Sequence, residues 1–290
     1  MRICYRLAMP LTTHPLSDRF GLEIRGIDLR HTPDASLITK IVNWLYLHSV
    51  ICIRSQSLSP AELLRFGECL GQPVEHNEAS LRLDGLPGVM SLSNADQRDD
   101  RQLNGGAHWH TDLIHTDTPA SFTMLNAVAV PEHGGGTVFA NQTAALEALD
   151  AERRSLARSL TLIHCYEGRT DGSMPTFEYP LVRPHPVTGR EALFGASDTG
   201  IGIVGMTSEE AAPVLREFEC HATRPEFVYL HHYQQHDVVI WDNAQLLHCA
   251  ERLQRARKSK MKRIMHRVSV RGWPTTNHSE INHPGKSSFA

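Results

Sequence analysis

The sequence lacks any apolar run that approaches the roughly 18 residues needed to span a bilayer. Its first ten residues, MRICYRLAMP, also lack the long apolar stretch of a signal peptide. These absences exclude a helical membrane protein and a secreted one from the function classes we consider. We therefore expect a cytoplasmic protein with no membrane partner.

Cysteine pairs and excess charge are also missing. The six cysteines are scattered without a CxxC pair, which argues against a disulfide framework or a zinc knuckle and predicts reduced, mostly buried thiols. Lys and Arg number 29 against 32 Asp and Glu, so the formal net charge is only -3 and no nucleic-acid partner is expected. A basic cluster over residues 252–263 is interpreted as a solvated segment.

No repeat or low-complexity linker divides the chain, so we expect a single domain. Residues 36–48 carry apolar side chains at helical spacing, and helical patterns recur over 142–158 and 207–221. The clearest helix start is at Ser59, with Pro60 at the first helical position and Glu62 completing a capping box.

Strand signals are short and numerous. Residues 22–29 alternate apolar and polar side chains, and further strands are predicted at 50–54, 122–130, 137–140, 181–183, 192–194, 227–232 and 237–241. Many short strands with helices early and between them indicate a β-rich α+β domain. A barrel or jelly roll with flanking helices would close such a set.

The segment GGAHWHTDLIHTD (105–117) spells His-Thr-Asp twice. On a strand, side chains at i and i+2 leave the same face, so either pair could present an imidazole and a carboxylate to one metal ion. A lone His-x-Asp is more often a pair of hydrogen-bonded polar residues at a strand end. A site of two histidines and one carboxylate needs a third ligand, and the candidate is His248, shortly after the strand at 237–241.

Five motifs in order resemble the taurine/2,4-D dioxygenase family of Fe(II)- and 2-oxoglutarate-dependent oxygenases. They are Trp109-His110-Thr111-Asp112, EHGGGTVFANQ (132–142), PHPVTGREALF (184–194), IWDNAQLLH (240–248) and RIMHR (263–267). The resemblance spans residues 13–273, and it implies one dioxygenase domain there, with flexible termini at 1–12 and 274–290.

The resemblance selects the first His-Thr-Asp. In the family a proline and the threonine of a Gly-Gly-x-Thr motif stand at fixed offsets after the ligand aspartate, and Pro119 and Thr137 fit Asp112, not Asp117. It therefore implies that His110, Asp112 and His248 hold Fe(II). His108 is expected beside the site at most.

The family's cosubstrate residues are matched as well. The resemblance implies that Arg263 binds the distal carboxylate of 2-oxoglutarate and that Thr137 adds a hydroxyl contact, since the planar fork of arginine suits a carboxylate. With O2, such an enzyme yields succinate, CO2 and an oxidised substrate. The carboxylate of Asp112 favours hydroxylation over the halogenation of relatives that lack it.

The prime substrate is expected to be a small organic anion. Arg267 follows Arg263 by four residues and corresponds to the family arginine that binds this anion, so we expect it to touch neither the iron nor 2-oxoglutarate. His76, His115 and Asn94 are further substrate-lining candidates. The loop before the metal pair does not reproduce the asparagine that binds taurine in relatives, so taurine is not the favoured substrate.

Some features leave alternatives open. The basic residues between His248 and Arg263 exceed the usual family spacing and could form a lid, a subunit contact or a disordered loop; we expect a homo-oligomer, a dimer or a tetramer. A non-catalytic or zinc-loaded binding protein on the same barrel, or a metal-dependent hydrolase or isomerase of the cupin kind, is the alternative function.

Overall fold

The structure, a computed structural model, describes residues 10–76, 79–95, 104, 106–166, 169–255 and 259–274. Most of the two expected flexible termini therefore lies outside the described residues. None of the helices in the described ranges combines the length and apolarity needed to cross a membrane.

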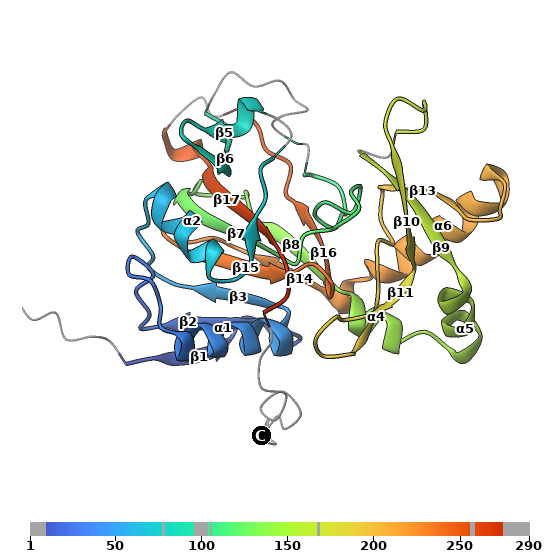
Figure 1. Cartoon of the computed structure of the whole chain (residues 1–290), viewed down its shortest axis with the longest axis horizontal. Coiled ribbons are helices and arrows are strands. Elements are labelled where there is room, and N and C mark those ends of the chain that lie inside the picture. The colour runs from blue at the N-terminus through green and yellow to red at the C-terminus, as the bar shows by residue number, and fades with distance from the viewer. Residues whose placement is uncertain are drawn as a thin grey trace, which may run out of the picture.

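A nine-stranded sheet forms the larger half of the molecule (Figure 1). Its order in space is β1 (Thr12–Pro15), β2 (Leu22–Arg25), β3 (Val50–Ile53), β15 (Val238–Asp242), β7 (Phe122–Ala129), β17 (Ile264–Arg271), β6 (Leu86–Ser93) and β5 (Arg82–Leu83), with β4 (Gln72–Pro73) paired to β17. Among the described strand pairs, only β2 and β3 run parallel. The strand β17, late in the sequence, therefore lies between β7 and β6.

Two helices cover the outer face of this sheet, α1 (Ala35–His48) and α2 (Pro60–Glu68) (Figure 1). The period of two along the strands explains why. In β3, Ile51 and Ile53 pack toward the helices, whereas Val50 and Cys52 point to the opposite face. The capping box predicted at the start of α2 is confirmed.

A second sheet faces the inner side of the first and consists of β14 (Val228–His231), β8 (Thr137–Asn141) and β16 (Leu246–Ala250). Its inner residue Phe139 packs in one cluster with Leu125, Trp241 and Met265 of the large sheet. Two sheets packed face to face with helices outside are the jelly-roll arrangement predicted from the strand pattern.

The remaining elements form the other end of the molecule (Figure 1). They are the strands β9 (Thr161–Cys165), β10 (Thr176–Pro180), β11 (Val182–Pro184), β12 (Glu191–Leu193) and β13 (Gly200–Ile203), the helices α4 (Gln142–Glu147), α5 (Ala151–Ser159) and α6 (Ser208–Ala222), and the 3-10 turn η3 (Pro225–Phe227). Two further 3-10 turns, η1 (Ala79–Leu81) and η4 (Ser259–Met261), belong to the large-sheet end and come just before β5 and β17. The outer face of the small sheet packs here through Ala140 and Leu247.

The helix predicted over 142–158 is wrong as one element, because it is two. The first helix ends at Glu147, and Asp150 begins the second by accepting a hydrogen bond from the backbone N–H of Arg153. An aspartate at this position satisfies the free N–H groups of a new helix start, so it separates the two elements. The helix predicted over 207–221 is α6, and Thr207 caps its start.

Candidate metal and cosubstrate site

The two histidines of the predicted triad lie directly opposite each other. His110 forms an isolated bridge to His248 of β16, and each backbone N–H donates to the other's carbonyl at 3.0 Å. The ring centroids of the two imidazoles are 4.2 Å apart. Backbone pairing alone therefore brings both rings to one point.

Asp112 also lies beside the two rings, but the backbone that places it there differs from the prediction. We expected His110 and Asp112 to share the face of a strand, but only His110 makes a bridge and Asp112 lies in a turn. The next residue, Leu113, has φ 59°, which is uncommon for a residue with a side chain. The backbone N–H of Asp112 donates to Asn243 Oδ1 at 3.3 Å, and this contact fixes the turn against the end of β15.

One ligand atom from each of the three residues lies within 4.8 Å of the others, as a metal site of this kind requires. His248 Nε2 is 3.5 Å from Asp112 Oδ2, and this oxygen is buried without a hydrogen-bond partner among the described residues. His110 Nδ1 lies 2.8 Å from the carbonyl of His108, which accepts a hydrogen bond from Nδ1–H and leaves Nε2 free to bind a metal. The donor set fits a divalent iron.

The protonation states of the three residues also suit metal binding. Burial lowers the pKa of His110 to about 4 and that of His248 well below its ordinary value, so both imidazoles are neutral and can act as ligands. Burial alone would raise the pKa of Asp112, but Arg267 and the two histidines outweigh it and hold that pKa well below its usual range. Asp112 is therefore an anion.

Arg267 contacts one of the three proposed metal ligands. Its Nη2 donates to Asp112 Oδ1 at 2.5 Å, and its Nε donates to Ser269 Oγ at 3.2 Å. The reason is that β17 lies beside β7 in the middle of the large sheet, so an inward side chain from it reaches the turn that carries Asp112. Arg267 thus forms an ion pair with Asp112.

Arg263 is a buried cation at the edge of the same cavity. Its Nε donates to the carbonyl of Gly135 at 2.7 Å, and its guanidinium carbon lies 5.7 Å from the centre of the Tyr233 ring. The Tyr233 hydroxyl contacts Thr137 Oγ1 at 2.8 Å. Among the described residues no carboxylate forms an ion pair with Arg263, so this buried charge is available to a bound anion.

A cavity of about 200 Å³ joins all these groups. Its lining includes the three triad residues, Thr137, Arg263 and Arg267, and also the predicted residues His76 and His115. Burial, with Arg267 adding to it, lowers the pKa of His76 to about 4, and burial lowers that of His115. The two arginines are therefore its fixed positive charges among the described residues that line it.

Asn94 does not line this cavity. Its amide nitrogen donates to the carbonyls of Gln254 and Met261 at 3.0 and 2.9 Å, and its oxygen accepts the backbone N–H of Arg263 at 2.7 Å. The side chain therefore holds the basic 252–263 segment in place. Leu253 from this segment forms part of the cavity wall, and residues 256–258 lie outside the described residues.

The side chains of the second His-Thr-Asp, at residues 115–117, do not come together at one point. His115 stacks edge-on against Tyr166, with ring centroids 4.8 Å apart, whereas Asp117 is exposed. Sequence reasoning missed Tyr233, which supports both Thr137 and Arg263, and the carbonyl of His108. Nothing in the local sequence marks either, because their roles depend on contacts between distant strands.

Residues 11–268 match the family described as taurine catabolism dioxygenase TauD, TfdA. The chain is similar to an alpha-ketoglutarate-dependent 2,4-dichlorophenoxyacetate dioxygenase of Cupriavidus pinatubonensis, with 28% identity over 88% of this chain and 97% of the relative. An alpha-ketoglutarate-dependent sulfate ester dioxygenase of Pseudomonas putida is 30% identical over 84% and 85%. The solved structure of AAD-2 with Mn(II) and N-oxalylglycine superposes with a TM-score of 0.80 and 27% identity, over 93% of this chain and 100% of that one.

Proposed function

Because this chain belongs to the TauD, TfdA family of dioxygenases, we propose that His110, Asp112 and His248 hold its iron and that Arg267 anchors an organic anion beside it. The protein is an Fe(II)- and 2-oxoglutarate-dependent dioxygenase that consumes O2. The observation that carries the residue assignment is that the converged triad and both arginines line one cavity.

The bound iron supplies O2 activation coupled to the decarboxylation of 2-oxoglutarate to succinate and CO2, which ends in oxidation of the prime substrate. The chain itself contributes positions and charges. Two neutral imidazoles and one carboxylate leave three coordination positions for the cosubstrate and O2. The buried walls keep bulk water away from them.

Arg263 and Thr137 are assigned to 2-oxoglutarate. The Arg263 guanidinium is held from one side by Gly135 and rests near the Tyr233 ring, so its orientation is fixed before a ligand arrives. A buried arginine fork without a carboxylate partner in the described chain matches the distal carboxylate of the cosubstrate. Thr137 lies on β8 of the small sheet, with its hydroxyl set by Tyr233.

The substrate is proposed to be an anion with an apolar body. Phenoxyacetates and sulfate esters, for which the relatives are named, each combine an anionic group with an organic group. Met90, Leu92 and Leu125 line the cavity, and Met90 lies directly opposite Arg267 across the β6–β17 pair. His76 and His115 complete the wall as neutral groups that can donate hydrogen bonds without adding charge.

Anaerobic titration tests the proposed function. Fe(II) and 2-oxoglutarate added together should give a weak absorption band in the middle of the visible range, which forms only when the cosubstrate chelates the iron. Adding a substrate anion should perturb the band, and admitting O2 should release succinate. If Fe(II) binds at the triad but no band appears with 2-oxoglutarate, the proposed dioxygenase function is wrong. The site is then a binding or hydrolytic centre.

Arg267→Ala should separate substrate oxidation from cosubstrate turnover. The variant is expected to keep the visible band, because Arg267 is assigned to neither the iron nor 2-oxoglutarate. Its KM for the anionic substrate should rise by about 30-fold or more, the cost of removing one partner of a buried charge pair. Arg267→Lys should restore only part of the lost affinity for the substrate. Lysine keeps the positive charge but lacks the planar guanidinium that can form two parallel hydrogen bonds.

The control for this prediction is Arg271→Ala, in an arginine of the same strand that is absent from the cavity lining. Steady-state succinate release with and without a sulfate ester or an aryloxyalkanoate makes the measurement. An unchanged kcat/KM in Arg267→Ala would place the anion elsewhere, with His76 as the next candidate.

The finer expectations stay predictions. These are the domain bounds 13–273, the cytoplasmic location, the homo-oligomeric state and the absence of nucleic-acid and membrane partners. Size-exclusion chromatography with light scattering checks the oligomeric state directly.

A further inference from the structure

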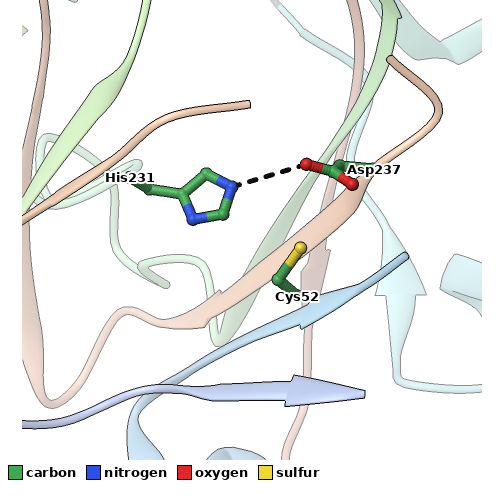
Figure 2. A group of neighbouring side chains, drawn as sticks. All are labelled: Cys52, His231 and Asp237. Atoms are coloured by element: carbon green, nitrogen blue, oxygen red, sulfur yellow. Dashed lines mark ion pairs between the residues drawn. The ribbon is translucent and has the colours of Figure 1, made fainter. Parts of the chain in front are cut away.

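A second group of metal-binding residue types lies outside the site described above. Cys52 comes from β3 of the large sheet, His231 from the end of β14 of the small sheet, and Asp237 from the residue just before β15 (Figure 2). Figure 2 shows the three side chains pointing toward one another between these strands. All three are buried, with 0% of Cys52, 0% of His231 and 1% of Asp237 exposed.

Two polar atoms of this cluster lack hydrogen-bond partners. His231 Nε2 and Asp237 Oδ1 are both buried and form no hydrogen bond with any described residue. His231 Nε2 is 3.8 Å from Asp237 Oδ2, which is longer than a hydrogen bond, and one ligand atom from each of the three residues lies within 4.8 Å of the others. Such atoms are seldom left unpaired inside a protein, so each needs an explanation.

The neighbours hold these side chains in the orientation that a ligand set needs. The Tyr229 hydroxyl lies 2.9 Å from His231 Nδ1. When this hydroxyl accepts a hydrogen bond from Nδ1–H, the lone pair of Nε2 is free to bind a metal ion. Asp237 Oδ2 accepts from Arg54 Nη1 at 2.5 Å and from the backbone N–H of Gln234 at 2.7 Å. One oxygen of the carboxylate is thus fixed and the other, Oδ1, is left for a ligand.

We propose that Cys52, His231 and Asp237 form a second metal site, for a zinc-type divalent cation, which is separate from the iron site and does not depend on the proposed function. Sulfur, imidazole and carboxylate together are donors that zinc accepts, whereas magnesium and calcium prefer oxygen alone. Three protein ligands leave a fourth position for a water molecule. The site would be structural, because the cluster is buried and none of its three residues lines the cavity of the iron site.

Geometry and charge are compatible with an ion. Zinc bonds of about 2.0–2.3 Å at tetrahedral angles put ligand atoms about 3.3–3.8 Å apart, so the cluster needs a contraction of about 1.5 Å at most. The thiolate and the carboxylate neutralise a divalent ion, and Glu23 balances Arg54 at 2.7 Å. Burial raises the pKa of the Cys52 thiol, so the ion has to displace its proton on binding.

The position of the cluster suggests what the ion does. It would connect β3 of one sheet to β14 of the other, behind the cosubstrate pocket. His231 is the cross-strand partner of Thr137, and its ring contacts that of Tyr233, with centroids 4.8 Å apart. An ion at His231 would therefore stiffen the wall that holds Thr137 and Tyr233.

The test removes the iron site first. The double variant His110→Ala/His248→Ala, produced as the full chain in zinc-supplemented medium, should still carry one zinc per chain by elemental analysis. Its Co(II) form should show a thiolate-to-cobalt charge-transfer band in the near ultraviolet, which the iron site cannot give because it has no sulfur ligand. Adding Cys52→Ala should remove the band and weaken zinc binding by about 100-fold or more.

Cys165→Ala is the matched control, because Cys165 is also a buried cysteine but lies on β9, away from the cluster. It should keep both the zinc and the band. If Cys52→Ala does not fold, Cys52→Ser keeps the volume with a poorer ligand and should show the same loss. A double variant without zinc, or equal zinc binding with and without Cys52, overturns the proposal and leaves the cluster as a buried polar network.

Discussion

Alanine at any one of His110, Asp112 and His248 is expected to abolish iron-dependent turnover. Each residue supplies one of three protein ligands, and the loss should exceed the roughly 10–100-fold that follows from losing a mere supporting partner of a ligand. Iron content by elemental analysis and succinate release at saturating 2-oxoglutarate make the measurement. Circular dichroism should show the fold retained in the two histidine variants.

Asp112 needs a milder substitution because it also pairs with Arg267. Asp112→Ala leaves a largely buried guanidinium without its anionic partner and destabilises the fold by about 3–5 kcal/mol, whereas Asp112→Asn keeps the shape and a hydrogen-bond acceptor. The matched controls come from the second His-Thr-Asp, as His115→Ala and Asp117→Ala. Iron binding that survives His110→Ala and disappears in His115→Ala would show that the other pair holds the metal.

The second large effect is expected at Arg263. Arg263→Ala should raise the KM for 2-oxoglutarate by about 30-fold to several thousand-fold, because truncating one partner of a buried, hydrogen-bonded charge pair typically costs about 2–5 kcal/mol. Arg263→Lys should recover part of this loss, since the ammonium keeps the charge but cannot reproduce two parallel hydrogen bonds.

Arg255→Ala is the control for Arg263, because it removes an exposed arginine of the same basic segment. Its KM for 2-oxoglutarate should match that of the unmodified enzyme. The reverse pattern, with Arg255→Ala impaired and Arg263→Ala normal, would move the cosubstrate carboxylate to the basic segment and leave the burial of Arg263 without explanation.

Local signals in the sequence located the features that depend on local chemistry. Ser59 and Thr207 begin helices because their hydroxyls cap free backbone N–H groups, and both are visible within four residues of sequence. His248 was a ligand candidate from its place after the strand at 237–241, and the family motifs selected His110 and Asp112 as its partners. The opposition of His110 and His248 across a bridge involves separate strands, which periodicity within one segment does not reveal.

The features that sequence reasoning missed all join distant segments. The ion pair of Arg267 with Asp112 spans 155 positions and depends on where β17 inserts in the sheet. Asn94 looked like a loop residue near the substrate, but its three hydrogen bonds hold the 252–263 segment. Cys52 looked like an inert thiol because neither His231 nor Asp237 is near it in sequence.

The placement of β17 also bears on how the chain folds during synthesis. This strand is the last of the described strands in sequence, yet it occupies the middle of the large sheet, between β7 and β6. Until the ribosome has released residues 264–271, β6 and β7 have unpaired edges, and such edges favour aggregation. The emergence of residues 264–271 from the ribosome, and not the growth of the N-terminal half, is therefore the step at which this sheet closes and both arginines reach the cavity.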